Sequence, residues 1–132
     1  MAEDQAKITN KIEDYLLQGG MPYEKIEENM WAIHDEFDNI ENIVVHYTEP
    51  LVIFRVKLME IPKNHREEFF EKLLCMNASN LVHGAYAIEA GNIIIVDTLE
   101  AENLDYNEFQ ASLDAIVMAI SNDFKELQKY VK

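Results

Sequence analysis

The second half of the chain, from Lys63 to Lys132, constrains the fold more than any other part of the sequence. It has the pattern of a helix, a short link, a tight pair of strands and a long helix. Between the first helix and the strands, a helical apolar pattern ends at small and amide residues, and a strand begins just after Gly84. That order predicts a two-layer α+β fold in which helices cover a sheet.

The first half adds a helix and further strands. Apolar residues at spacings of three and four predict a helix from Glu3 to Gln18, which ends at Gly19-Gly20. Alternating side chains then predict strands that pair through short turns. The expected strands are residues 30–35, 42–48, 51–61, 85–89 and 93–99, with residues 24–29 as a polar lead-in.

Two capping patterns place the later helices. Asn64 with Glu67, and Asp105 with Glu108, have the spacing of a capping box, in which each partner satisfies a free backbone N–H of the other. The predicted order is α-β-β-β-α-β-β-α. It corresponds to an α+β fold with an antiparallel sheet and helices on one face, in a single domain of residues 1–132.

The charge of the chain excludes several classes of function. Its 132 residues include 25 acidic and 11 basic side chains, which gives a net charge of −14. This balance opposes binding to nucleic acids and to anionic membranes, because both carry negative charge. No apolar run approaches the roughly 20 residues of a membrane span. A single cysteine, Cys75, and an acidic N-terminus favour the cytoplasm.

No group of residues predicts catalysis or a bound cofactor. The four histidines, at positions 34, 46, 65 and 83, do not have the spacing of a metal site. The acidic run 35–41 lacks the alternating oxygen ligands of a calcium loop, because Phe37 and Ile40 interrupt it. Neither a phosphate-binding loop nor a nucleophile elbow is present. The sequence therefore predicts a protein that is not an enzyme and needs no cofactor or metal.

The strand over residues 51–61 has apolar residues on both faces. Leu51, Ile53 and Met59 are expected on the face opposite Phe54. If no helix covers that face, these residues form an apolar patch of the kind that marks a protein interface. The other interpretation is that the neighbouring basic side chains cover the patch with their aliphatic stems.

One set of residues in the second half of the chain matches a known family. These residues are Phe70, Leu73, Leu74, Asn77, Leu81, Gly84, Tyr86 and Ile88, then Ile93-Ile94-Ile95-Val96, then Leu113, Ile116 and Val117. Trp31, at the start of a strand after an N-terminal helix, fits the same pattern. With these residues the chain resembles the YbjN-type domain, which is related in fold to type III secretion chaperones such as the Tir chaperone class.

This resemblance implies a non-enzymatic, chaperone-like module that forms a homodimer and binds extended segments of an effector or regulatory protein. Secretion chaperones dimerise through the middle helix and an adjoining strand, and their partners wrap over apolar patches. The apolar side of the middle helix also fits burial within its own monomer. The candidate interface residues are Leu51, Ile53, Met59, Phe69, Phe70, Leu73 and Met76.

A second hypothesis comes from a different functional class. Trp31, Tyr47 and Tyr86 are large side chains on expected strands. They could line a pocket between the sheet and the helices, as in a small-molecule sensor or regulatory domain.

Overall fold

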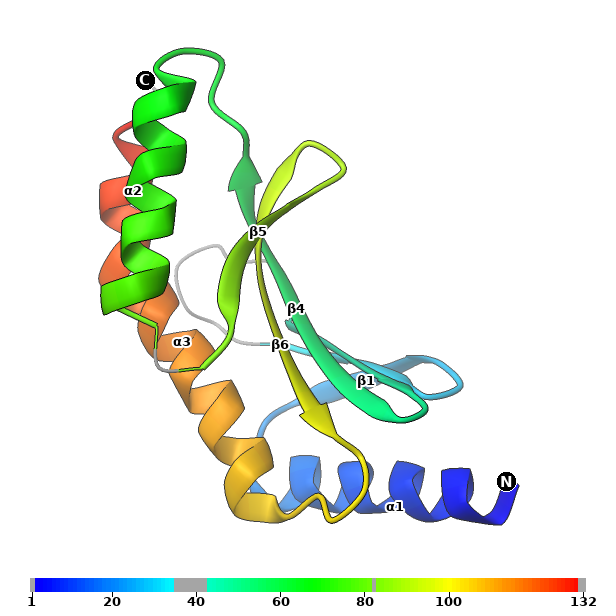
Figure 1. Ribbon diagram of the computed structural model, residues 1–132. Helices are drawn as coiled ribbons and strands as arrows, with labels where there is room; N and C mark the ends of the chain where they lie inside the picture. Colours follow the sequence, from blue (N-terminus) through cyan, green and yellow to red (C-terminus); the bar gives the residue numbers. More distant parts are fainter. Residues whose placement is uncertain (1, 35–42, 82, 131–132) are drawn as a thin grey trace.

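The computed structural model describes residues 2–34, 43–81 and 83–130, with side chains from Ala6 onward. The acidic run 35–41 lies outside the described residues. The elements follow the order α-β-β-β-β-α-β-β-α (Figure 1). Their bounds are α1 Ala2–Gln18, β1 Tyr23–Glu27, β2 Met30–Ile33, β3 Ile43–Thr48, β4 Leu51–Glu60, α2 Arg66–Ser79, β5 Ala85–Glu89, β6 Asn92–Glu100 and α3 Tyr106–Gln128.

The strands form one antiparallel sheet in the order β1-β2-β3-β4-β6-β5. The predicted α+β class and antiparallel sheet are confirmed. The structure has one more strand than predicted, because β1 occupies the segment treated as a polar lead-in. As an edge strand with four of its five residues exposed, β1 pairs with β2 through its backbone and needs no apolar alternation.

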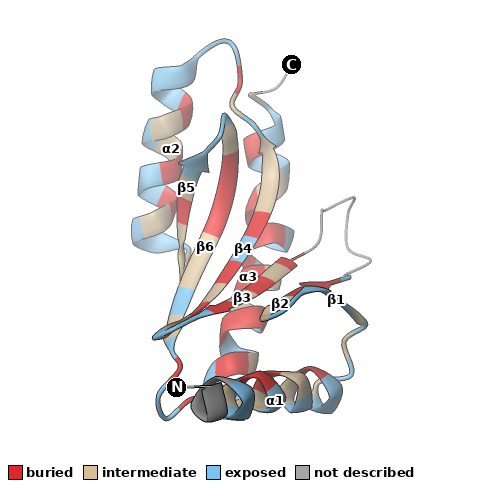
Figure 2. Cartoon of the chain, turned by 90° about the vertical axis from the view of Figure 1, so that its right-hand side faces the viewer, coloured by how far each residue is buried: buried red, intermediate tan, exposed pale blue. Residues whose placement is uncertain are grey.

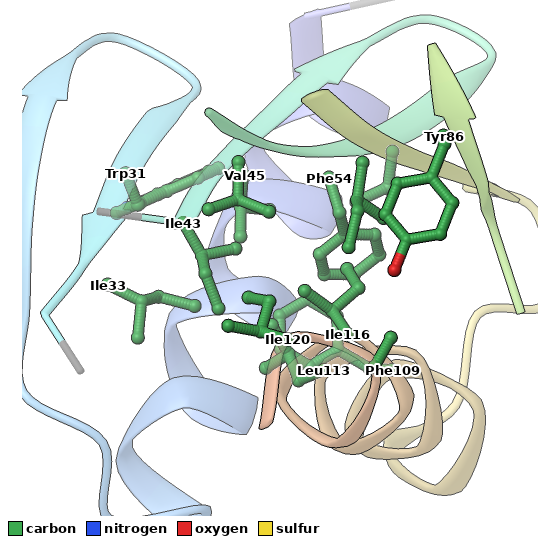
Figure 3. Packing of buried hydrophobic residues seen from close by; sticks show 14 of the residues in the cluster. Trp31, Ile33, Ile43, Val45, Phe54, Tyr86, Phe109, Leu113, Ile116 and Ile120 are labelled. Atoms are coloured by element: carbon green, nitrogen blue, oxygen red, sulfur yellow. The ribbon is translucent and has the colours of Figure 1, made fainter. Parts of the chain in front are cut away.

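All three helices pack against the same face of the sheet. Val45 and Phe54 lie side by side on β3 and β4, and both are fully buried beneath the helices. The Phe54 ring lies 5.2 Å from the ring of Phe109 on α3, measured between centroids. Figure 3 shows these residues in one cluster with Trp31. The core therefore lies between this inner face and the helices, as the sequence predicts.

The two predicted helix caps have different outcomes. The Asp105 side chain accepts a hydrogen bond from the backbone N–H of Glu108 at 2.8 Å, so the cap of α3 is confirmed. The Asn64 cap is wrong, because α2 begins one residue later than that cap requires. His65 occupies the N-cap position in a left-handed conformation, with φ of 56°, and its side chain makes no capping hydrogen bond.

Candidate functional site

The face of the sheet turned away from the helices is the main candidate site. In Figure 2, β4 and β6 face the viewer and α3 lies behind them. Ile53 lies on this face between His46 of β3 and Thr98 of β6, and it is half-buried without joining the core cluster. We call this surface the outer face. It comprises Val44, His46, Leu51, Ile53, Arg55, Lys57, Ile94, Val96 and Thr98.

Charged side chains cover part of the outer face. Arg55 lies 3.7 Å from Glu89, but both side chains are about half exposed, so the pair contributes little stability. Ile94 lies between Lys57 and Ala87 on the neighbouring strands and is only 7% exposed. The outer face thus combines half-buried apolar residues with aliphatic stems of basic ones. It contains elements of both predicted interpretations.

Leu51 and Ile53 lie on the outer face as predicted, whereas the face predicted for Met59 is wrong. A bulge between Lys57 and Met59 shifts the register, so Met59 pairs with the fully buried Ile93. Met59 accordingly packs against the core cluster. A single extra residue reverses the side to which the following side chains point, and periodicity alone does not reveal it.

The middle helix, α2, buries most of its predicted interface residues. Phe69, Leu73 and Met76 are at most 5% exposed and belong to the core of the monomer. Phe70 is half-buried at the edge of the core, beneath the guanidinium of Arg66 at 5.5 Å from the ring centroid. One turn later, Leu74 is 69% exposed. The interface roles of these residues stay predictions.

A polar network joins the C-terminal end of α2 to β5 and α3. The Tyr86 hydroxyl donates a hydrogen bond to Asp123 at 2.6 Å, and the Asn80 amide donates to the other carboxylate oxygen at 2.9 Å. Burial, and then the hydrogen bond and negative charge of Asp123, raise the pKa of Tyr86 well above its ordinary value. Asp123 is 3% exposed. Sequence reasoning missed this network, although Asp123 falls within the apolar stripe of α3.

Two residues of the predicted ligand pocket, Trp31 and Tyr47, lie on neighbouring strands of the inner face, whereas Tyr86 is set apart from them. Trp31 is fully buried and donates its indole N–H to Glu13 at 3.0 Å. Tyr47 donates its hydroxyl to Glu49, at the turn between β3 and β4. Tyr86 lies on β5, which is separated from β3 by β4 and β6. Tyr47 lines a cavity beside α1 together with Lys7 and Lys11, and neither Trp31 nor Tyr86 lines that cavity.

The described part of the chain shows neither a metal cluster nor a spanning helix. No group of three or more His, Cys, Asp or Glu side chains within residues 6–34, 43–81 and 83–130 could hold a metal ion. None of the helices in the described ranges is both long and apolar enough to cross a membrane.

Comparisons with solved structures support the fold. The chain is similar to a chain of the ExsC–ExsE complex, with a TM-score of 0.71 and 11% identity over 93% of this chain and 95% of that one. For YbjN from E. coli, the TM-score is 0.67 with 14% identity, over 89% and 91% of the two chains. The heterodimeric ExoU–SpcU complex from the type III secretion system of Pseudomonas aeruginosa gives a TM-score of 0.66 with 18% identity, over 82% and 90%.

The sequence itself identifies the family. No curated protein shows a significant match to the chain. The CesT_Tir_1 model, which represents a type III chaperone family, matches residues 5–132. The predicted resemblance is thus confirmed over nearly the whole chain, and the protein belongs to the CesT_Tir_1 family.

Proposed function

We propose that this protein is a non-enzymatic, chaperone-like module of one domain that binds an extended segment of a partner protein in the cytoplasm. The observation that carries the proposal is the outer face, where half-buried apolar residues lie on a sheet surface without a covering helix. Apolar side chains that remain partly accessible on an uncovered sheet face are typical of interaction sites. The structures of the ExsC–ExsE and ExoU–SpcU complexes, in which similar chains bind other proteins, support the same function.

The shape of the outer face favours an extended partner. Residues that alternate along a strand point to one side about 7 Å apart. Leu51 and Ile53 therefore form a straight row along β4. An extended segment has the same spacing between alternate side chains, so its apolar residues can lie against this row. Arg55 and Lys57 continue the row and keep the surface hydrated when no partner is bound.

The homodimer belongs to the same proposal, and α2 is its proposed interface. Phe70 and Leu74 are one helical turn apart and form the accessible apolar edge of this helix. Phe69, Leu73 and Met76 hold α2 against the core from the other side. In the proposed dimer, these three core residues hold α2 in position, and Phe70 and Leu74 contact the second copy.

Partner binding is tested by substitutions on two surfaces. Ile53→Asp introduces a charge into the outer face and should remove a partner captured from lysate of the source cells. Leu17→Asp is the matched control, because Leu17 is 67% exposed on α1, away from the outer face. Equal capture by both variants and the wild type would refute the proposed site. If circular dichroism shows that Ile53→Asp does not fold, Ile53→Thr replaces it in the capture experiment, because threonine is polar and strands favour it.

The dimer is tested through the single cysteine. Cys75 is exposed on α2, next to Leu74, so a short bismaleimide should link two copies into a species of twice the 15.3 kDa chain mass. Leu74→Asp should abolish the linked species, and light scattering should then give the mass of a monomer. A wild-type monomer at micromolar concentration would contradict the dimer and leave the partner site untouched.

A further inference from the structure

The two edges of the sheet differ in how they are protected. On β1, glutamates, Lys25 and a bulge discourage the pairing of another strand. On β5, the residues before Glu89 are uncharged, and Ile88 is 54% exposed. No further strand of the described chain pairs with the open side of β5. By composition alone, β5 is the edge to which another strand would add more readily.

A side chain of α2 occupies part of this open edge. The backbone N–H of Tyr86 donates to the Asn77 side-chain oxygen at 2.7 Å, and the Asn77 amide donates to the carbonyl of Tyr86 at 3.4 Å. A neighbouring strand would make the same pair of contacts with an antiparallel residue. The primary amide of Asn77 therefore takes the place of a peptide group beside β5.

We propose that Asn77 is an internal guard that blocks strand addition at the β5 edge. Backbone groups of alternate residues point to the same side of a strand, so the next pair that faces outward belongs to Ile88. With Asn77 in place, an incoming strand can form backbone hydrogen bonds only with Ile88 and not with Tyr86. One such residue is too few to hold a paired strand. Asn80, at the C-cap of α2, hydrogen-bonds to Asp123 on α3 and not to the backbone of Tyr86.

The strand that the guard excludes is β5 of a second copy. A net charge of −14 makes two copies repel each other over most of their surface. The β5 edge is an exception, since residues 85–88 are uncharged and Glu89 is paired with Arg55 of the same chain. Two such edges can therefore align antiparallel without placing like charges opposite each other. Asn77 lies three residues after Leu74 on α2, so the guarded edge adjoins the α2 surface proposed for the dimer.

Amide hydrogen exchange tests the guard without any partner. In the wild type, the Tyr86 amide should be protected while the Ile88 amide exchanges freely. At a protein concentration too low for association through β5, Asn77→Ala should speed exchange at Tyr86 by about 3- to 10-fold, the range expected for loss of one hydrogen bond. Asn80→Ala is the matched control, because it removes an amide of the same network and leaves the Tyr86 backbone contacts intact. Equal rates at Tyr86 in the wild type and Asn77→Ala would overturn the proposal.

Sedimentation velocity tests the consequence for association. Asn77→Ala should form larger species than the wild type at the same concentration, and Asn80→Ala should not. Adding Ile88→Pro to Asn77→Ala should reverse this, because proline removes the outward N–H of β5. Association of Asn77→Ala that persists with Ile88→Pro would show that another surface is responsible and would overturn the proposal, as would unchanged sedimentation. Neither result depends on whether the outer face binds a partner.

Discussion

The hydrogen bond between Tyr86 and Asp123 should be one of the most stabilising polar contacts in the protein. Tyr86 is 6% exposed and Asp123 is 3% exposed, so the bond is shielded from water. Removing the hydroxyl with Tyr86→Phe leaves one oxygen of a buried carboxylate without its donor. Hydrogen bonds to charged groups contribute about 1.5–3 kcal/mol, and we expect a loss of this size in the free energy of unfolding.

A double-mutant cycle isolates this contact from other effects. Urea unfolding of the wild type, Tyr86→Phe, Asp123→Ala and the double variant gives four free energies, with unchanged m-values as the check for two-state unfolding. The coupling energy should be about 1.5–3 kcal/mol, because the second substitution has no bond left to break. A coupling below about 0.5 kcal/mol would refute the reasoning, since it would mean that water replaces the hydroxyl at no cost.

Two further predictions follow from the surroundings of the same strand. Because the pKa of Tyr86 is raised in the folded protein, the unfolded chain loses its phenol proton first, and stability from this group is lost as the pH rises above about 10. Urea unfolding should show this loss as a slope of about 1.4 kcal/mol per pH unit that Tyr86→Phe lacks, and identical alkaline slopes would contradict it. Gly84→Ala should lower the free energy of unfolding by about 1–3 kcal/mol, because φ is +81° and the new Cβ would lie 2.8 Å from the Val96 carbonyl oxygen. Gly91→Ala has a similar φ but open space, so thermal melts should show a smaller loss there; equal losses would exclude the close contact as the cause.

The sequence predicts the layered fold because its apolar periodicity changes at the element boundaries. The alternation along β4 correctly places Phe54 inside and Ile53 outside. It fails at Met59, because a bulge depends on pairing with β6 and has no local signature. The capping pattern of Asn64 with Glu67 also fails, because His65 and not Asn64 occupies the N-cap position of α2.

The candidate site is predicted less completely than the fold. Leu51 and Ile53 follow from alternation alone, and the structure places both on the outer face. Asn77 could not be assigned from its spacing, because its contact with Tyr86 joins a helix to an edge strand. Asp123 could have been identified from the sequence, because it is a carboxylate at a core position of the α3 stripe. A carboxylate at such a position requires buried hydrogen-bond donors.

The central claim is that the protein binds a partner segment through an apolar surface. The most direct measurement is capture from lysate of the source cells at low and high salt, with the bound protein identified and quantified by mass spectrometry. We expect one partner in a fixed ratio to the protein, retained at high salt, because apolar contacts are not screened by ions. Capture of no protein would contradict the claim. Capture of only basic proteins that high salt removes would also contradict it, and would show that the net charge of −14 alone causes the binding.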